Sequence, residues 1–302
     1  MSTVYIGTSE FAAAVLERLA AAGRHRPTLV LTRPDRPSGR GRRLASPPVA
    51  EAARALGIEL AQPQSVNDEP TRELIARHGG TVVVCAFGAL IKEPLLSEHE
   101  LLNVHPSLLP RWRGAAPVER AIMAGDERTG VSIMRLTAGL DSGPVCLTGA
   151  EPIGPEDSYG ALAARLQALA GELLVRALEE RPAFVEQAEQ GVTYAEKLGP
   201  EDRLLDPARP AVELERVVRA LHPHIGARAR LPDGAMLGVH RAKLADADAD
   251  ADAAGPGLHA RGGRLLLGAT PGALELLVVQ LPGGRAMDAG AYLRGHPALG
   301  RA

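Results

Sequence analysis

Three polar side chains in this sequence could act together on one substrate: Asn103, His105 and Asp141. Asn103 and His105 lie two positions apart in the apolar segment 101–105, and residues two apart in a strand project from the same side. Asp141 follows in the turn-forming sequence Gly-Leu-Asp-Ser-Gly at 139–143. An amide donor, an imidazole and a carboxylate that meet can move protons at a substrate. When each residue is considered singly, composition favours an ordinary structural role: Asn103 as a turn cap, His105 as a hydrogen-bonded histidine at a strand end, and Asp141 as a turn aspartate.

Other chemistries lack their usual motifs. The sequence contains no Gly-x-x-x-x-Gly-Lys phosphate loop, no His-Glu-x-x-His and no Gly-x-Ser-x-Gly. The first strand is followed by Gly-Thr-Ser-Glu-Phe at 7–11 instead of Gly-x-Gly-x-x-Gly, which gives little support for a dinucleotide cofactor. With two cysteines, and with His222 and His224 separated by a proline, we expect no metal site.

The first half of the chain alternates short apolar runs with helical patterns. This alternation predicts an α/β domain with a doubly wound, mostly parallel sheet. Such sheets bind ligands at the carboxyl ends of their strands, where Asn103 and His105 are expected. The expected strands are 4–6, 28–32, 58–62, 81–86, 101–105 and 131–136, and the expected helices are 10–22, 47–56, 70–77, 115–124 and 159–180.

The pattern changes after residue 181. An extended connector is expected at 192–200 and a helix at 211–221, followed by strands at 229–231, 237–244, 265–268 and 274–281. This predicts a smaller β-barrel domain. The expected organisation is therefore a catalytic domain at 1–184, a linker at 185–205 and a C-terminal domain at 206–302.

Charge and hydropathy narrow the class of protein. In 302 residues, 34 Lys and Arg face 36 Asp and Glu, a net charge of −2, which excludes a strongly basic nucleic-acid-binding protein but not a local basic patch. One such patch is the segment 33–43, which has five arginines interleaved with proline and glycine and no helical pattern. It is either an exposed turn or a binding loop. No apolar run is long enough to span a membrane and no signal pattern opens the chain, which predicts a cytoplasmic protein.

The amino-acid sequence around Asn103, His105 and Asp141 indicates a protein family more specifically. The sequence Asn-Val-His-Pro-Ser-Leu-Leu-Pro-Arg-Trp-Arg-Gly-Ala-Ala-Pro at 103–117, with 139–143 downstream, closely resembles the 10-formyltetrahydrofolate-dependent formyltransferases. Within that superfamily the chain is similar to the methionyl-tRNA formyltransferase family, supported by the segments 7–12, 33–43 and 192–198. The resemblance covers most of residues 4–200. It departs at 222–225, where His-Pro-His-Ile replaces the Asn-Pro-Trp-Pro often found in the family.

The resemblance implies transfer of the formyl group of 10-formyltetrahydrofolate to the α-amino group of methionine on an initiator tRNA. Asn103 and a protonated His105 would donate hydrogen bonds to the formyl oxygen, and Asp141 would pair with His105 and relay the amine proton. No metal is required. The residues expected to bind folate are Phe87, Gly88, Leu90, Ile91, Ser107, Leu108, Leu109 and Pro110.

The same resemblance implies where the tRNA is bound. The arginines of the loop that would contact it are Arg36, Arg40, Arg42 and Arg43, with Arg40 and Arg42 foremost. From residue 206 onward the chain has 12 basic and 10 acidic residues, and Tyr292 is its one aromatic residue. A domain of this composition would attract the tRNA backbone without stacking on bases. The protein is expected to be a monomer.

Three other functions stay open at this stage. A formyltransferase acting on a small-molecule amine, such as a purine precursor or an amino sugar, would share the three polar residues. A hydrolase that releases formate from the folate would need no amine acceptor. A catalytically inactive folate- or RNA-binding module is the third possibility, and the intact Asn103, His105 and Asp141 argue against it.

Overall fold

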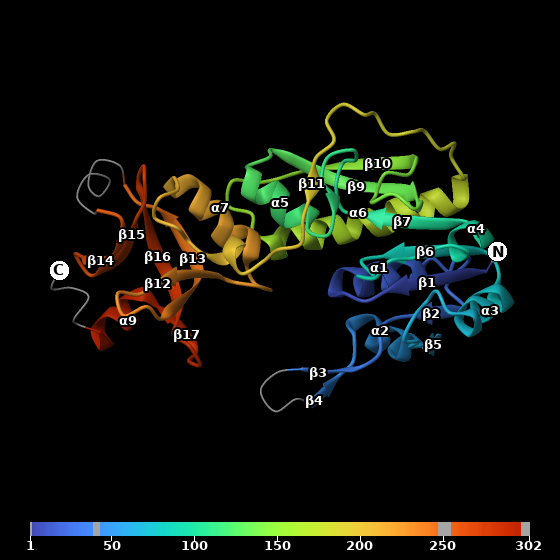
Figure 1. The fold of residues 1–302 in the computed structure, drawn as a ribbon, viewed down its shortest axis with the longest axis horizontal. Helices are drawn as coiled ribbons and strands as arrows, with labels where there is room; N and C mark the ends of the chain where they lie inside the picture. The colour runs from blue at the N-terminus through green and yellow to red at the C-terminus, as the bar shows by residue number, and fades with distance from the viewer. Residues whose placement is uncertain (1, 39–42, 247–254, 297–302) are drawn as a thin grey trace. The chain divides into compact units, whose positions relative to one another are not determined.

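The strand that carries Asn103 and His105 lies inside a seven-stranded sheet (Figure 1). The computed structural model of the protein describes residues 2–38, 43–246 and 255–296. The sheet order is β10-β9-β7-β6-β1-β2-β5. Its strands are β1 (Thr3–Gly7), β2 (Leu29–Leu31), β5 (Glu59–Ala61), β6 (Thr81–Cys85), β7 (Leu101–His105), β9 (Arg128–Arg135) and β10 (Val145–Pro152). The five strands from β7 to β5 pair in parallel, while β9 and β10 add an antiparallel edge. The predicted mostly parallel sheet is confirmed.

Helices cover both faces of this sheet, as the alternation of side chains in β1 shows. Val4 and Ile6 pack in one apolar cluster with Ile75 of α3 (Glu69–His78). Tyr5, which projects from the opposite face, donates its hydroxyl to the Ala12 carbonyl of α1 (Glu10–Ala21) at 2.6 Å. The arrangement is therefore doubly wound. The other helices of the first half are α2 (Pro48–Leu56), α4 (Leu95–Glu98) and α5 (Pro117–Ala124), and α6 (Tyr159–Glu180) follows β10.

Several elements of the first half were not predicted, among them an edge strand of the sheet and a pair of short strands. The edge strand β10 is half-buried and contains Gly149 and Pro152, which strands disfavour, so its sequence gives a weak β signal. The short strands β3 (Arg36–Ser38) and β4 (Arg43–Ala45) pair antiparallel, so the arginine-rich segment forms the two arms of a hairpin.

A second sheet is built from the last third of the chain and is antiparallel, in the order β12-β13-β16-β15-β14 with β17 beside β16. Because β12 also contacts β14 at the other end of this order, the sheet curls into a half-barrel. The helix α7 (Ala211–Leu221) packs Leu214 and Val218 into its core. The strands are β12 (Ala227–Arg230), β13 (Met236–Leu244), β14 (Gly257–Arg261), β15 (Arg264–Gly268), β16 (Ala273–Gln280) and β17 (Ala286–Asp288), followed by α9 (Ala289–Gly295). This agrees with the predicted β-rich domain.

The chain divides into two units. The first comprises Met1–Pro117, Arg128–Pro152 and Ala163–Ala195, and the second comprises Val118–Glu127, Ile153–Leu162 and Glu196–Ala302. Residues Ala163–Ala195 therefore belong to the unit that carries Asn103 and His105. Within the described ranges, no helix has the length and apolar character needed to cross a membrane.

Candidate active site

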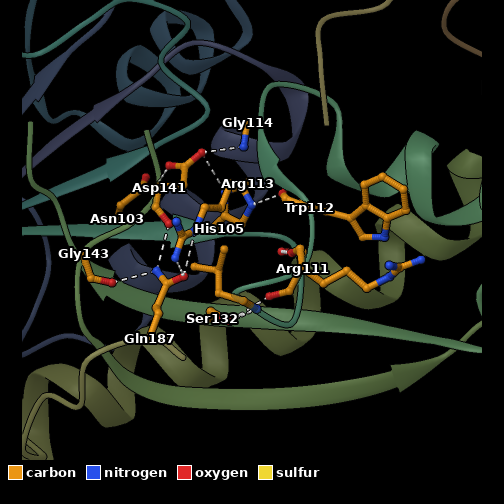
Figure 2. A network of polar contacts seen from close by, with 12 residues as sticks. Asn103, His105, Arg111, Trp112, Arg113, Gly114, Ser132, Asp141, Gly143 and Gln187 are labelled. Atoms are coloured by element: carbon orange, nitrogen blue, oxygen red, sulfur yellow. Dashed lines mark hydrogen bonds and ion pairs between the residues drawn. The ribbon is translucent and has the colours of Figure 1, made fainter. Parts of the chain in front are cut away.

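The side chains of Asn103 and His105 project from the same side of β7 and meet the carboxylate of Asp141 (Figure 2). Both are almost fully buried, with 8% and 4% of their surface exposed. The Asn103 amide donates from Nδ2 to Asp141 Oδ1 at 3.2 Å, and His105 Nδ1 lies 3.6 Å from Asp141 Oδ2. The structure therefore brings together all three polar residues that the spacing singles out.

The Asp141 carboxylate is held from the backbone side as well. Its Oδ2 accepts a hydrogen bond from the Gly114 N–H at 2.8 Å, while Oδ1 is held by Asn103. The backbone of Asp141 has φ of 42°, in the left-handed region that residues other than glycine rarely adopt. Such a conformation persists when surrounding contacts hold it, and these contacts fix the direction of the carboxylate.

The imidazole of His105 is oriented by the main chain. Its Nε2 donates to the Trp112 carbonyl oxygen at 2.8 Å, because a carbonyl oxygen can only accept. That bond commits Nε2 and leaves Nδ1 as the nitrogen that faces Asp141. The Nδ1–Oδ2 distance of 3.6 Å is longer than a hydrogen bond but within the range of an ion pair.

The chain that follows β7 is supported by a later segment. The strand β8 (Arg113–Gly114) pairs in parallel with β11 (Tyr194–Ala195), and the Trp112 N–H donates to Thr193 Oγ1 at 2.9 Å. Gly114 has φ of 121°, and a Cβ at this position would lie 2.7 Å from the Ala195 carbonyl oxygen. Glycine is therefore required here for the backbone N–H to reach Asp141.

Gln187 belongs to this network although nothing in its sequence context indicates it (Figure 2). Its side-chain amide contacts the main chain of Asp141 and Gly143 and the guanidinium of Arg113. An isolated glutamine in a segment assigned to a linker gives no signal of function. Only the fold reveals it.

Comparisons with known proteins bear on what this network does. A protein-family model described as "Formyl transferase" matches residues 1–178, and one described as "Formyl transferase, C-terminal domain" matches residues 197–297. This chain belongs to the formyl transferase family. A relative named methionyl-tRNA formyltransferase from Aromatoleum aromaticum is 41% identical over 304 residues, covering 98% of this chain and 95% of the relative.

Solved structures of formyl transferases share the fold. A methionyl-tRNA formyltransferase from Clostridium thermocellum superposes with a TM-score of 0.60 at 13% identity, covering 82% of this chain and 95% of that one. An N-formyltransferase from Helicobacter canadensis, solved with folinic acid and dTDP-3-aminofucose, gives a TM-score of 0.64 at 13% identity, covering 91% of this chain and 98% of that one.

The first segment expected to bind folate in this formyl transferase offers exposed backbone between two anchors. Phe87 and Ile91 are buried in the apolar core, whereas Gly88 is exposed and the Leu90 side chain is 71% exposed. Asn67 holds the segment by donating to the Leu90 carbonyl at 2.9 Å and accepting from the Lys92 N–H at 2.8 Å. An exposed main chain beside an apolar side chain fits a flat, polar-edged ring.

The second expected folate segment is fixed by the sheet. Ser107 is fully buried and its hydroxyl donates to the Arg111 carbonyl at 2.7 Å, so this side chain supports the loop from inside. Ser132 of β9 donates to the Ser107 carbonyl at 2.7 Å and accepts from the Leu109 N–H at 3.1 Å. The half-buried Leu108, Leu109 and Pro110 form the outer part of the segment.

The arginine-rich hairpin is anchored at its base. Asp35 accepts hydrogen bonds from Gln62 Nε2 at 2.7 Å and from Ser46 Oγ at 3.0 Å, and the bond from Gln62 lowers the pKa of the Asp35 carboxyl. Arg36 is exposed on β3. The backbone of Arg43 forms the first position of β4, and Arg40 and Arg42 lie outside the described residues. In the part of the chain that the structure describes, no group of three His, Cys, Asp or Glu side chains could hold a metal ion.

Proposed function

We propose that this formyl transferase transfers the formyl group of 10-formyltetrahydrofolate to the α-amino group of methionine on initiator tRNA, acting as a monomer in the cytoplasm. The observation that carries the proposal is the convergence of Asn103, His105 and Asp141 in a chain 41% identical, over nearly its whole length, to a methionyl-tRNA formyltransferase. Initiator methionyl-tRNA and folate are its two substrates.

The reaction replaces one carbon–nitrogen bond by another. The amine nitrogen attacks the formyl carbon, and the bond from that carbon to N10 of the folate breaks. The amine nitrogen gives up one proton, and N10 takes one up. Negative charge builds on the formyl oxygen in between, so hydrogen-bond donors aimed at that oxygen lower the barrier.

Two donors are available at the carboxyl end of β7. Asn103 uses one N–H on Asp141, which leaves the other N–H of the same amide for the formyl oxygen. The protonated Nδ1 of His105 is the second donor, because Nε2 is committed to the Trp112 carbonyl. Both groups are buried, and a hydrogen bond to a developing charge is stronger there than in water.

Asp141 is the proposed acceptor of the proton that the amine gives up. Its carboxylate stands 3.6 Å from His105 Nδ1 and can take the amine proton directly or through water. The hydrogen bonds from Gly114 and Asn103 keep it in place while the proton moves. No side chain has to form a covalent bond with the formyl group.

The folate is proposed to lie between the two segments described above. Backbone groups of 87–91 would bind the pterin edge, and Leu108, Leu109 and Pro110 would form the wall. The fixed main chain of both segments supports this placement, since Asn67 holds one and Ser132 the other. The formyl carbon would then face Asn103 and His105.

The tRNA is proposed to be bound by separate groups. Arg36, Arg40, Arg42 and Arg43 of the hairpin would contact the acceptor end. In the half-barrel, β12 alternates buried alanines with exposed Arg228 and Arg230, which would attract the tRNA backbone. This division supports a macromolecular acceptor over a small-molecule amine.

The test measures transfer of a radiolabelled formyl group by the purified full chain. Initiator methionyl-tRNA is compared with elongator methionyl-tRNA, a purine-precursor amine, a nucleotide-linked amino sugar and water. Preferential formylation of initiator methionyl-tRNA is expected. Faster transfer to either small amine, or release of formate without an acceptor, would refute the proposal. Sedimentation of the free protein tests the monomer.

A further inference from the structure

Gln187 joins two parts of the proposed catalytic network, the 141–143 loop and Arg113, with one side chain. Its Nε2 donates to the Asp141 carbonyl at 2.8 Å and to the Gly143 carbonyl at 2.7 Å. Its Oε1 accepts from Arg113 Nε at 3.0 Å and from Arg113 Nη2 at 2.8 Å. Both donors and both acceptor positions of the amide are thus used inside the protein, which leaves none for a substrate.

The backbone that carries Gln187 is itself fixed on both sides. Two residues earlier, Val185 forms an antiparallel bridge with Val145, with N–H to carbonyl distances of 2.8 and 2.9 Å. Further along, β11 pairs with β8. Backbone contacts therefore hold the segment on both sides of Gln187.

These contacts close a ring around Asp141 (Figure 2). The Gly114 N–H holds the carboxylate, the neighbouring Arg113 side chain reaches Gln187, and Gln187 returns to the Asp141 carbonyl. The ring fixes the main chain and the side chain of one residue at once. Asp141 needs such support because its φ of 42° is unfavourable for a residue with a Cβ.

We propose that Gln187 is a positioning residue for formyl transfer: it holds the 141–143 loop so that the Asp141 carboxylate faces His105 and the attacking amine. The inference rests on the proposed function and adds a residue that does not touch either substrate. Since a reacting group displaced by about 1 Å can lose on the order of 10²-fold in rate, partial release of the loop is expected to lower kcat.

Two substitutions separate the contacts. Gln187→Met keeps the length of the side chain and removes all four hydrogen bonds. Gln187→Glu keeps an acceptor for Arg113 but turns carboxylate oxygens toward the carbonyls of Asp141 and Gly143. The matched control is Gln190→Met, a glutamine on the same segment whose side chain is exposed.

Both variants at Gln187 are expected to lower kcat about tenfold while KM for folate and for tRNA stays within about twofold of wild type. The control is expected to match wild type. In an Asp141→Asn background, Gln187→Met should cause less than about a twofold further loss, because the group that it positions has already lost its charge.

Several results would overturn the inference. These are an unchanged kcat in Gln187→Met, a loss confined to KM, a lowered melting temperature without a change in kcat, or full multiplication of the two losses in the double variant. If Gln187→Glu retains wild-type kcat, the contact with the loop carbonyls is not the operative one and the inference also fails. A wild-type chain without transfer activity would instead refute the proposed function, and this inference with it.

Discussion

The network of Asn103, His105 and Asp141 and the described arms of the arginine hairpin lie in the same unit but differ in how their side chains are held. Asn103 and His105 are buried, and each is held by a hydrogen bond, Asn103 to the Asp141 carboxylate and His105 to the Trp112 carbonyl. The base of the hairpin is held through Asp35, and Arg36 is exposed on β3. A group that stabilises a developing charge must be in place beforehand, whereas a cation that contacts a large, folded substrate gains from freedom to adjust. From this contrast we expect substitutions in the network to change kcat and substitutions of the hairpin arginines to change the KM for tRNA.

Removing a donor from the network should give the largest effect. We expect Asn103→Ala or His105→Ala to lower kcat by roughly 10²-fold or more, with little change in folate affinity, because each deletes a donor to the formyl oxygen. Steady-state kinetics and direct folate binding check this. Near-normal turnover in both variants would contradict the role of Asn103 and His105 as donors to the formyl oxygen, and with it the expected difference between the network and the hairpin.

Neutralising the carboxylate should be nearly as damaging. Asp141→Asn keeps the shape of the side chain but removes the charge that accepts the amine proton, so we expect kcat to fall on the order of 10²-fold. The measurement is kcat across a pH series, beside wild type. A pH–rate profile identical to that of wild type would contradict the acid–base assignment.

The main-chain side of the network can be tested at Gly114. A Cβ there would lie 2.7 Å from the Ala195 carbonyl oxygen and the φ of 121° would be strained, so β8 must move away from β11. We expect Gly114→Ala to lower kcat about tenfold and to lower Tm. Gly191→Ala is a control for strain alone, because it also has positive φ but open space around its Cβ. If the two variants have equal kcat, the Gly114 N–H does not position Asp141.

The hairpin should respond differently. We expect Arg42→Ala to raise KM for initiator tRNA about tenfold while folate affinity is unchanged, because it removes a specific contact and no reacting group. Kinetics with initiator and elongator methionyl-tRNA across a salt series check this. A loss that high salt erases would make the hairpin a charged surface only.

The smallest effect is expected on the half-barrel. Arg228 is exposed on β12, so Arg228→Ala should weaken tRNA binding about two- to threefold and reduce the salt slope by about one or less. The comparison is made at several salt concentrations with wild type and with Arg42→Ala. Equal behaviour of the two variants would remove the distinction between specific and diffuse contacts.

Much of the fold is predictable from local patterns. Short runs of three to six residues between helical segments predict the parallel strands, and the helices at 159–180 and 211–221 occur where the periodicity places them. The hairpin and β10 were not predicted, because their prolines, glycines and half-exposed positions give no clear alternation of apolar and polar residues. Their pairing is decided by neighbouring strands instead.

The sequence by itself determined that Asn103 and His105 share one side of a strand, because side-chain direction in a strand follows from its two-residue period. The tertiary structure decided what they meet. Asp141 and Asn103 are 38 residues apart, and Gln187 and Asp141 are 46 apart, so these contacts depend on where loops return to the sheet. The tertiary structure also committed His105 Nε2 to a carbonyl and turned Ser107 inward, since a buried polar group takes the partner that the fold supplies.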